Sequence, residues 1–303
     1  MQKQSRRTFL IHAGLGAALA ASGLPRRVSA NPLGKPVGIQ LYTVNDDLKR
    51  DPAGTLKALA KIGYREVEAA GFAGVEPKTF RGMIDDAGLR CVSAHLEFDM
   101  DRLDKAFEEA HILGAGYAAA SSLIGNAGKA MSTKLEWKSA MGREEARHTV
   151  DIANRIGAAA KRAGLQFILH NHDREFVDLG NGETGYDIVW RDTDPTLVQF
   201  EIDCGWMVFA GRDPAEYFRK YPGRIPAIHV KDFLPKQDRN GKPMAEQMRG
   251  AELGHGSIDY RPIFAAAKAG GLKHYFVEQE APFARMPPLE AAKVDYDYLH
   301  AIN

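Results

Sequence analysis

Four segments in the second half of the chain alternate apolar and polar residues and then end in two polar residues spaced i and i+2. These terminal pairs are His170/His172, Glu201/Asp203, His229/Lys231 and Glu278/Glu280. Because alternate side chains of a β-strand point to the same face, both members of a pair share a face. The pattern predicts four strands, each with an apolar face and a cluster of polar groups at its carboxyl end.

A joint between helix and strand recurs along the chain. At four places a helical segment is followed by glycine and then at once by a strand-like segment, around Gly63, Gly88, Gly164 and Gly271. Glycine suits the left-handed conformation that closes many helices. An acidic residue followed by proline marks helix starts at positions 51–52, 76–77 and 213–214. The chain is therefore predicted to repeat a strand–helix unit.

The repeat defines the expected elements and fold. We predict strands near 37–44, 64–69, 89–95, 116–120, 165–170, 197–203, 225–231 and 273–279, and helices near 52–62, 77–87, 101–113, 142–163, 186–191, 213–220, 260–269 and 288–301. Eight such units in about 270 residues are typical of an α/β protein with a closed (β/α)8 TIM barrel. No linker divides the segment 31–303, so we expect a single domain. An open doubly wound sheet is the alternative, but no glycine-rich fingerprint follows the first strand.

Two predicted loops, 121–141 and 232–257, are longer than a bare barrel needs. Both follow strands, so both are expected on the catalytic face. Long loops at that face usually form lids or the walls of a substrate pocket.

Residues 1–30 have the features of a twin-arginine export signal. The segment 5–10 (SRRTFL) carries the arginine pair, a weakly apolar run follows over 11–24, and 28–30 (VSA) offers a cleavage site. The apolar run is short and interrupted by glycine, which argues against a permanent membrane span. A disordered basic tail is the alternative. We expect the twin-arginine export machinery as a partner and a periplasmic or secreted location.

Charge and cysteine content narrow the partners further. The chain has 40 basic and 39 acidic residues, and residues 1–30 hold five of the basic ones and no acidic one. Thirty-five basic residues then stand against thirty-nine acidic ones, which argues against nucleic acid as a partner because such binding depends on basic surfaces. Cys91 and Cys204 are predicted on the third and sixth strands, too far apart across a barrel to form a disulfide. Both are expected to be free and buried.

Ligand-type side chains gather at the predicted strand ends. Asp203, His229 and Glu278 supply two carboxylates and an imidazole from strands six, seven and eight. The fifth strand offers His170, His172 or the nearby Glu175. Such a set suits an open, octahedral divalent site, with Mn foremost and Mg, Co or Zn as alternatives. Taken singly, any one of these acidic residues can equally be a loop residue that caps a helix or forms a salt bridge.

At this point the chain resembles the sugar phosphate isomerase/epimerase family, the xylose isomerase-like TIM barrels. The resemblance covers roughly residues 31–303. It rests on 38–44 (GIQLYTV), 93–95 (SAH), 170–176 (HNHDREF), 203–206 (DCGW), 229–232 (HVKD), 253–259 (LGHGSID) and 277–280 (VEQE). Each motif is weak alone; their order along the strands is specific for the family but not for a substrate.

The resemblance implies a metal held by Glu, Asp, His and Glu from strands five to eight. Asp203, His229 and Glu278 match three of these positions. His170 occupies the position of the first Glu, and Glu175, in the following turn, is taken as the fourth ligand. Trp206 stands where the epimerases have a substrate-facing His. Because one Glu is missing, one-sided proton transfer, elimination or hydration can replace two-sided epimerisation.

Roles follow from this chemistry. Glu278 is the candidate base, and His170 or His172 the candidate acid–base partner. His95, Trp206, Lys231 and Glu280 are the candidate substrate-binding residues. Three of these residues can instead have a purely structural role. His95 can be a buried histidine with its hydrogen bonds made within the protein, Trp206 can pack in the core, and Lys231 can form a salt bridge with Asp232.

We therefore expect an exported, metal-dependent isomerase or epimerase that acts on a carbohydrate or keto-carbohydrate by enediolate-type proton transfer. A lyase or hydratase acting on 3-keto-glycosides in the same barrel is the alternative. A non-catalytic periplasmic sugar-binding barrel is another, and a phosphodiester-cleaving relative is disfavoured by the acidic charge. A small sugar is the expected ligand, and association into a homo-oligomer stays open because no interface stripe stands out.

Overall fold

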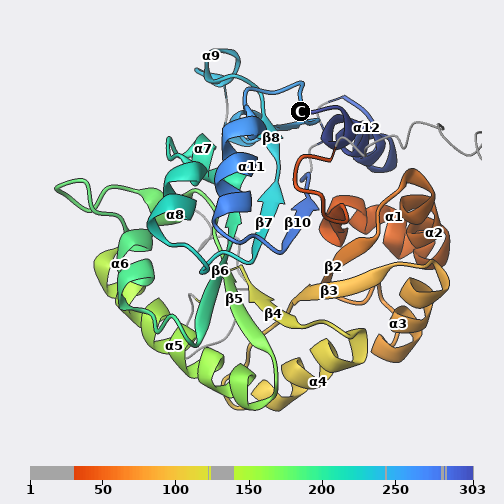
Figure 1. Ribbon diagram of the computed structural model, residues 1–303, viewed down its shortest axis with the longest axis horizontal. Helices are drawn as coiled ribbons and strands as arrows, with labels where there is room; N and C mark the ends of the chain where they lie inside the picture. The colour runs from red at the N-terminus through yellow and green to blue at the C-terminus, as the bar shows by residue number, and fades with distance from the viewer. Residues whose placement is uncertain are drawn as a thin grey trace, which may run out of the picture.

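Eight parallel strands close into a barrel in the computed structural model of the chain, which describes residues 31–121, 123, 140–242, 244–280, 283 and 285–302 (Figure 1). Around the barrel the strands follow the order β1, β10, β7, β6, β5, β4, β3, β2. Their bounds are β1 (Gly38–Gln40), β2 (Glu66–Ala70), β3 (Arg90–His95), β4 (Tyr117–Ala120), β5 (Gln166–His170), β6 (Val198–Asp203), β7 (Ala227–Val230) and β10 (His274–Val277). The predicted TIM barrel is confirmed. The predicted leader and most of the predicted loop 121–141 lie outside the described residues.

Helices surround the barrel and alternate with its strands (Figure 1). Eight of them match the predicted helices: α2 (Pro52–Ile62), α3 (Pro77–Asp86), α4 (Leu103–Leu113), α5 (Arg143–Arg162), α6 (Gly185–Asp192), α8 (Pro214–Lys220), α11 (Tyr260–Ala269) and α12 (Pro288–Ala301). Asp51 and Asp213 cap α2 and α8 through their side chains, each followed by proline at the first helical position. Among the described residues, no helix is both long and apolar enough to span a bilayer.

The first predicted strand, 37–44, is too long. It ends at Gln40, and residues Leu41–Val44 form the 3-10 helix η1, followed by α1 (Asn45–Arg50). The side-chain oxygen of Gln40 accepts a hydrogen bond from the backbone N–H of Tyr42 at 2.9 Å. This local bond turns the chain out of the strand.

Short elements that the sequence did not predict lie after the strands. They are η4 (Arg174–Phe176), α7 (Cys204–Phe209), β8 (Asp232–Phe233), α9 (Lys236–Arg239), α10 (Met244–Gln247) and β9 (Gly250–Ala251). The last four occupy the predicted long loop 232–257, in which β8 and β9 form an antiparallel pair.

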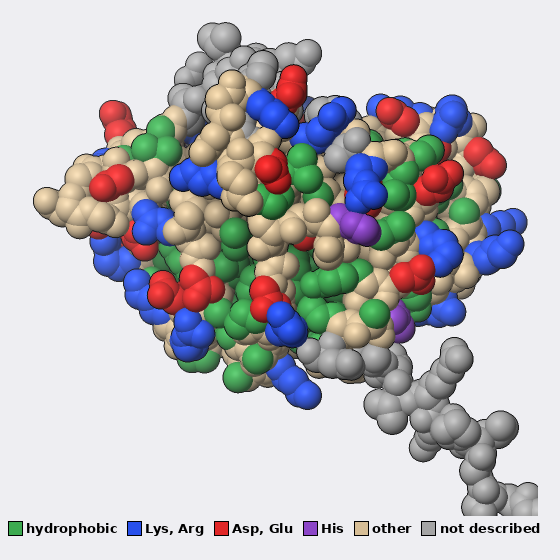
Figure 2. Space-filling view, turned by 90° about the horizontal axis from the view of Figure 1, so that it is seen from above, with side chains coloured by type: hydrophobic (Ala, Val, Ile, Leu, Met, Phe, Trp, Pro, Cys, Tyr) green, Lys and Arg blue, Asp and Glu red, His purple; other side chains and the backbone are tan. Residues whose placement is uncertain are grey.

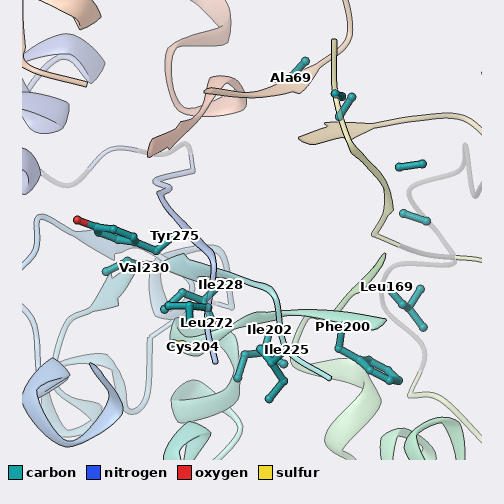
Figure 3. Close-up of a cluster of buried hydrophobic side chains, with 14 of the residues drawn as sticks. Ala69, Leu169, Phe200, Ile202, Cys204, Ile225, Ile228, Val230, Leu272 and Tyr275 are labelled. Carbon is teal, nitrogen blue, oxygen red and sulfur yellow. The ribbon is translucent and has the colours of Figure 1, made fainter. Parts of the chain in front are cut away.

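The core is a layer between the strands and the helices. Outward-facing strand residues such as Phe200, Ile202, Ile228 and Tyr275 are fully buried in it (Figure 3). Cys204 belongs to this layer, although it is the first residue of α7 (Cys204–Phe209) and does not lie on the sixth strand as predicted. Both Cys91 and Cys204 are free and buried, as expected.

A second, smaller apolar cluster fills the barrel interior. It consists of Val92, Ala119, Ile168, Ala227 and Phe276. Ile168, Ala227 and Phe276 each lie two residues before a polar residue of the predicted pairs, so the polar residue projects to the same inner face. The barrel interior is therefore polar at the carboxyl ends of the strands and apolar one layer closer to their amino ends.

The outer surface carries charges of both signs. Lys and Arg side chains are interspersed with Asp and Glu over the face seen in Figure 2, without a continuous basic area on that face.

Candidate metal centre and active site

A layer of polar residues, all buried except the partly exposed His95, covers the apolar interior cluster at the mouth of the barrel. Its members come from five strands and the residue that follows β10: Glu68, His95, His170, Glu201, Asp203, His229 and Glu278. The strand register pairs Asp203 with His229 on β6 and β7, and His170 with Glu201 on β5 and β6. The alternation noted in the sequence brings these side chains together because the strands are parallel and in register.

Four of these residues form a group with the geometry of a metal site: His170, Asp203, His229 and Glu278. Each offers one ligand atom, the four atoms lie within 4.8 Å of one another, and all four residues are buried. The Oδ1 atom of Asp203 accepts a hydrogen bond from the backbone N–H of Trp206 at 2.8 Å. The buried Oδ2 atom accepts no hydrogen bond from the backbone of the described residues and lies 3.1 Å from the ammonium Nζ of Lys231. Two imidazoles and two carboxylates are donors that fit a divalent cation.

Glu175, the ligand expected after the fifth strand, belongs to neither group of residues with metal-site geometry. It lies in η4, where its Oε2 atom accepts a hydrogen bond from the backbone N–H of His172 at 3.0 Å. Burial raises the pKa of its carboxyl group to about 7. The short 3-10 turn directs the carboxylate back to its own backbone, so His170 takes the place expected for Glu175.

Two further carboxylates, Glu68 and Glu201, lie beside the ligand imidazoles. The Oε2 atom of Glu68 is 2.6 Å from Nε2 of His229, and Oε2 of Glu201 is 3.3 Å from Nδ1 of His170. Both carboxylates are fully buried. Burial and the neighbouring Glu68 raise the pKa of Glu201, but the imidazoles of His229 and His170 outweigh them and hold it at about 2.

His95 lies between these two carboxylates. Its Nε2 atom is 3.1 Å from Oε2 of Glu201 and 3.2 Å from Oε2 of Glu68. Burial lowers the pKa of His95, but the two carboxylates outweigh burial and raise it to about 10. A second group with metal-site geometry consists of His95, His170, Glu201 and His229, so the two groups share two imidazoles.

Lys231 is a buried cation beside the metal-site group. Its Nζ atom lies 2.7 Å from Oε2 of Glu278 and 3.1 Å from Oδ2 of Asp203, and it also pairs with Glu280. Burial lowers the pKa of Lys231, but these carboxylates raise it well above its usual value. The alternative salt bridge to Asp232 is wrong. Oδ1 of Asp232 accepts hydrogen bonds from the backbone of the 232–257 loop and its end, at Phe233, Ser257 and Ile258.

A cavity of about 660 Å³ opens beside the group. Its inner end is lined by His95, His170, His172, Glu278 and Glu280, all of which the sequence singled out.

Trp206 and Lys231, also expected to face substrate, are not among the residues that line the cavity. The side chain of Trp206 is 2% exposed, packs against Phe209 and Phe233, and donates its indole N–H to Glu280 at 3.3 Å. The core-packing alternative for Trp206 therefore describes its position. Lys231 is likewise enclosed and contacts the cavity residues Glu278 and Glu280.

Sequence reasoning missed Glu68 altogether and gave Glu201 no role. A signal for Glu68 exists: Glu66 and Glu68 form a polar i, i+2 pair on the second strand, like the pairs on the later strands. This pair occupies the first and third positions of β2, whereas the later pairs lie at the carboxyl ends of their strands.

Comparison with known proteins places the chain in a family. A family model described as a xylose isomerase-like TIM barrel matches residues 56–302. The chain belongs to this family. The family resemblance noted in the sequence is thus confirmed.

Several curated proteins that are similar in sequence to this chain are named inosose dehydratases. The protein from Lacticaseibacillus casei is 27% identical over 263 residues, which are 79% of this chain and 85% of the relative. The protein from Clostridium tetani is 31% identical over 176 residues, which are 54% of this chain and 57% of the relative. Among solved structures, a sugar phosphate isomerase/epimerase from Parabacteroides distasonis is 26% identical, with a TM-score of 0.68, and the match covers 88% of this chain and 94% of that one.

Proposed function

We propose that this protein is a divalent-metal-dependent lyase that acts on a polyhydroxylated ketone. It removes the proton next to the carbonyl group and expels an oxygen substituent from the following carbon. The relatives named inosose dehydratases support this reading over the isomerase or epimerase that the sequence alone favoured.

The observation that carries the proposal is the asymmetry of the cavity wall. Of the two carboxylates in the metal-site group, Glu278 lines the cavity and Asp203 does not. The remaining inner wall presents three imidazoles, from His95, His170 and His172, and the carboxylate of Glu280, which is paired with Lys231. Epimerisation through two carboxylates needs one on each face of the substrate. One metal-site carboxylate facing imidazoles, with Glu280 already engaged by Lys231, is suited instead to removing a proton at one carbon and protonating a leaving oxygen at the next.

The residues then have separate tasks. Glu278 accepts the proton, the electrons of the broken C–H bond form a C=C bond, and the C–O bond breaks. The leaving oxygen takes a proton and departs as water, so the products are water and an unsaturated ketone. A bound divalent cation supplies a Lewis acid that stabilises negative charge on the carbonyl oxygen. We assign the proton donor to His95, because Glu68 and Glu201 on either side of it favour its charged form.

We assign binding roles to the other two imidazoles of the cavity, those of His170 and His172. His170 belongs to the metal-site group, and His172 is placed to hydrogen-bond a substrate hydroxyl at the inner end of the cavity. Lys231 holds Glu278 and Asp203 in their ionised form by direct charge contact. We propose Mn²⁺ as the resident ion, since mixed oxygen and imidazole donors at an open site suit it.

The experiment is product analysis in deuterated water. Protein loaded with Mn²⁺ is incubated with a keto-inositol and with keto-hexoses, and the products are followed by mass spectrometry and ultraviolet absorbance. The proposal predicts a product lighter by one water that absorbs as an unsaturated ketone. Recovery of an isomer of unchanged formula, with deuterium at carbon, would establish the isomerase or epimerase instead. Binding without any chemical change would establish the non-catalytic sugar-binding barrel.

We also propose export by the twin-arginine route, supported by the sequence of residues 5–10 and 28–30. Replacing Arg6 and Arg7 by lysine is expected to leave the protein in the cytoplasmic fraction with its leader attached. An unchanged distribution between cell fractions would contradict export by this route.

A further inference from the structure

The cavity is longer than the metal-site group requires. From Glu278 it continues past the carboxyl ends of β1, β2 and β3 and reaches α4. Its volume of about 660 Å³ lies well within the range of about 300–1,000 Å³ for sites that enclose drug-sized ligands, and one sugar ring fills only part of such a space. The outer part therefore has room for a second group.

Tyr42, which follows β1, stands on the wall of the cavity. Half of its surface is exposed, and it is the one aromatic residue among the large apolar side chains that are exposed in the described chain. The hydrogen bond from its backbone N–H to Gln40 fixes the turn that carries it. An aromatic ring exposed on a cavity wall offers an apolar face on which the ring of a ligand can stack.

Phe72 also lines the cavity, in the turn that follows β2, where it is partly buried and packs against the hydrophobic core. Residues after β1 and β2 are neighbours because the two strands pair along Gly38–Gln40. The turn is strained: Ala73 has a φ of 53°, in the left-handed region that disfavours a β-carbon. The backbone N–H of Val75 donates to the carbonyl of Phe72 at 3.0 Å and closes the turn. Strain of this kind persists where the surrounding structure enforces it, commonly at binding sites.

The charges of the cavity wall disfavour an anionic ligand group. Outside the inner end, the lining holds the acids Glu97, Asp99 and Glu109 against the bases Arg102 and Lys105. The two cations are already paired, Arg102 with Asp99 at 3.1 Å and Lys105 with Glu109 at 3.8 Å. A phosphate or carboxylate in the outer part would meet more negative than positive charge. The wall offers aromatic faces and hydrogen-bonding groups, which is the chemistry that binds an uncharged sugar ring.

We propose that the outer part of the cavity is a subsite for a second, uncharged ring, which stacks on Tyr42 and Phe72. The substrate is then a keto-sugar or keto-cyclitol joined to another ring and carries no phosphate. This inference rests on the proposed function, because it places the ketone at Glu278, and it adds the substrate class.

The test compares substrates that share one keto ring: a keto-hexose, its 6-phosphate, and the disaccharide in which the same keto-hexose is linked to glucose. kcat/KM is measured for the wild type and for Tyr42→Ala, Phe72→Ala and the control Val177→Ala. Val177 is 45% exposed and lies outside the cavity lining. Thermal unfolding of each variant confirms that it folds.

The subsite predicts that the wild type prefers the disaccharide and disfavours the phosphate. Tyr42→Ala and Phe72→Ala should each lower kcat/KM for the disaccharide by about tenfold, the order of effect of losing an aromatic contact. The loss should be larger for the disaccharide than for the keto-hexose, and Val177→Ala should match the wild type on all three substrates. Equal kcat/KM for one and two rings, or preference for the phosphate, would overturn the subsite while leaving the lyase in place.

A binding measurement separates the two proposals. Calorimetric titration with cellobiose and with glucose needs no chemistry, since neither sugar is a ketone. Tighter binding of cellobiose that is lost in Tyr42→Ala, without elimination from any keto-sugar, would support the subsite and overturn the lyase. Equal binding of both sugars in the wild type and in Tyr42→Ala would overturn the subsite.

Discussion

The Nε2 atom of His229 lies 2.6 Å from Oε2 of Glu68, and both residues are buried. The opposite nitrogen, Nδ1, faces Glu278 at 2.9 Å. When Nε2–H donates to Glu68, the lone pair of Nδ1 is directed toward the metal-site group. Carboxylates placed behind ligand imidazoles in this way fix the tautomer and the ring orientation. Glu68 is itself held by the side-chain N–H of Gln40 at 2.8 Å.

Replacement of Glu68 should therefore weaken metal binding. We expect Glu68→Ala to raise the Kd for Mn²⁺ by about 10- to 100-fold, the range for loss of such a partner. Glu68→Gln keeps an oxygen that accepts from Nε2–H, so its loss should be smaller. Calorimetric titration of the metal-free proteins measures both effects. If Glu68→Ala binds Mn²⁺ as tightly as the wild type, Glu68 does not orient His229.

Lys231 neutralises the carboxylates of the group when no metal is bound. Lys231→Met leaves Asp203 and Glu278 buried without their cation, so the free energy of unfolding of the metal-free protein should fall by about 3 kcal/mol. Mn²⁺ should restore more stability to this variant than to the wild type, because a competing cation has gone. Urea unfolding with and without Mn²⁺ gives both numbers.

The matched control is Lys293→Met, which removes an exposed ion pair with Asp297 on α12. Its effect should be within about 0.5 kcal/mol. The proposed counter-ion role of Lys231 is contradicted if the two lysine variants have the same stability without metal.

Asp295 gives the protein a pH-dependent stability. Burial raises the pKa of its carboxyl group to about 7, although it accepts hydrogen bonds from the backbone N–H of Leu253 and from the side chain of Gln279. The folded-state pKa is above the unfolded value of about 3.9. The cost of ionising Asp295 is thus absent below pH 4, grows between pH 4 and 7, and is complete above pH 7.

Asp295→Asn keeps the shape of the side chain and removes this cost. The stability of the variant relative to the wild type should increase by about 2–4 kcal/mol between pH 5 and pH 8. Urea unfolding of both proteins at the two pH values measures the change. A difference that is the same at both values would show that Asp295 is ionised throughout.

Gly205 makes room for Lys231. A β-carbon at position 205 would lie 2.9 Å from both Cβ and the backbone oxygen of Lys231. Gly205→Ala should lower the free energy of unfolding by about 1–3 kcal/mol. The control is Gly82→Ala in α3, where the added carbon meets no atom within 4 Å and a better helix former should add about 0.5–1 kcal/mol. Chemical denaturation of the two variants should shift in opposite directions.

The barrel was predictable because each strand and helix has a local signal. Period-two alternation marks strands such as β5 and β6, and acid–proline pairs mark the starts of α2 and α8. Asp203, His229 and Glu278 were predictable as a group because parallel strands bring their carboxyl ends to one rim.

The features that could not be predicted from the sequence depend on hydrogen bonds of individual side chains at the strand ends. Asp203 both ends β6 and caps α7, and this six-residue helix turns Trp206 into the core. The side chain of Glu175 bonds to the nearby backbone and not to the metal-site group. Glu68 acts through His229, a partner 161 residues away in the chain, and no local pattern encodes such a contact.

The most direct test of the account is titration of the metal-free protein with Mn²⁺, for the wild type and for Asp203→Asn combined with His229→Ala. The wild type is predicted to bind a single ion per chain, and the double variant is predicted to lose this binding while keeping the barrel by circular dichroism. A wild type that takes up no divalent ion, or a double variant that binds Mn²⁺ with unchanged affinity, would contradict the metal centre formed by His170, Asp203, His229 and Glu278.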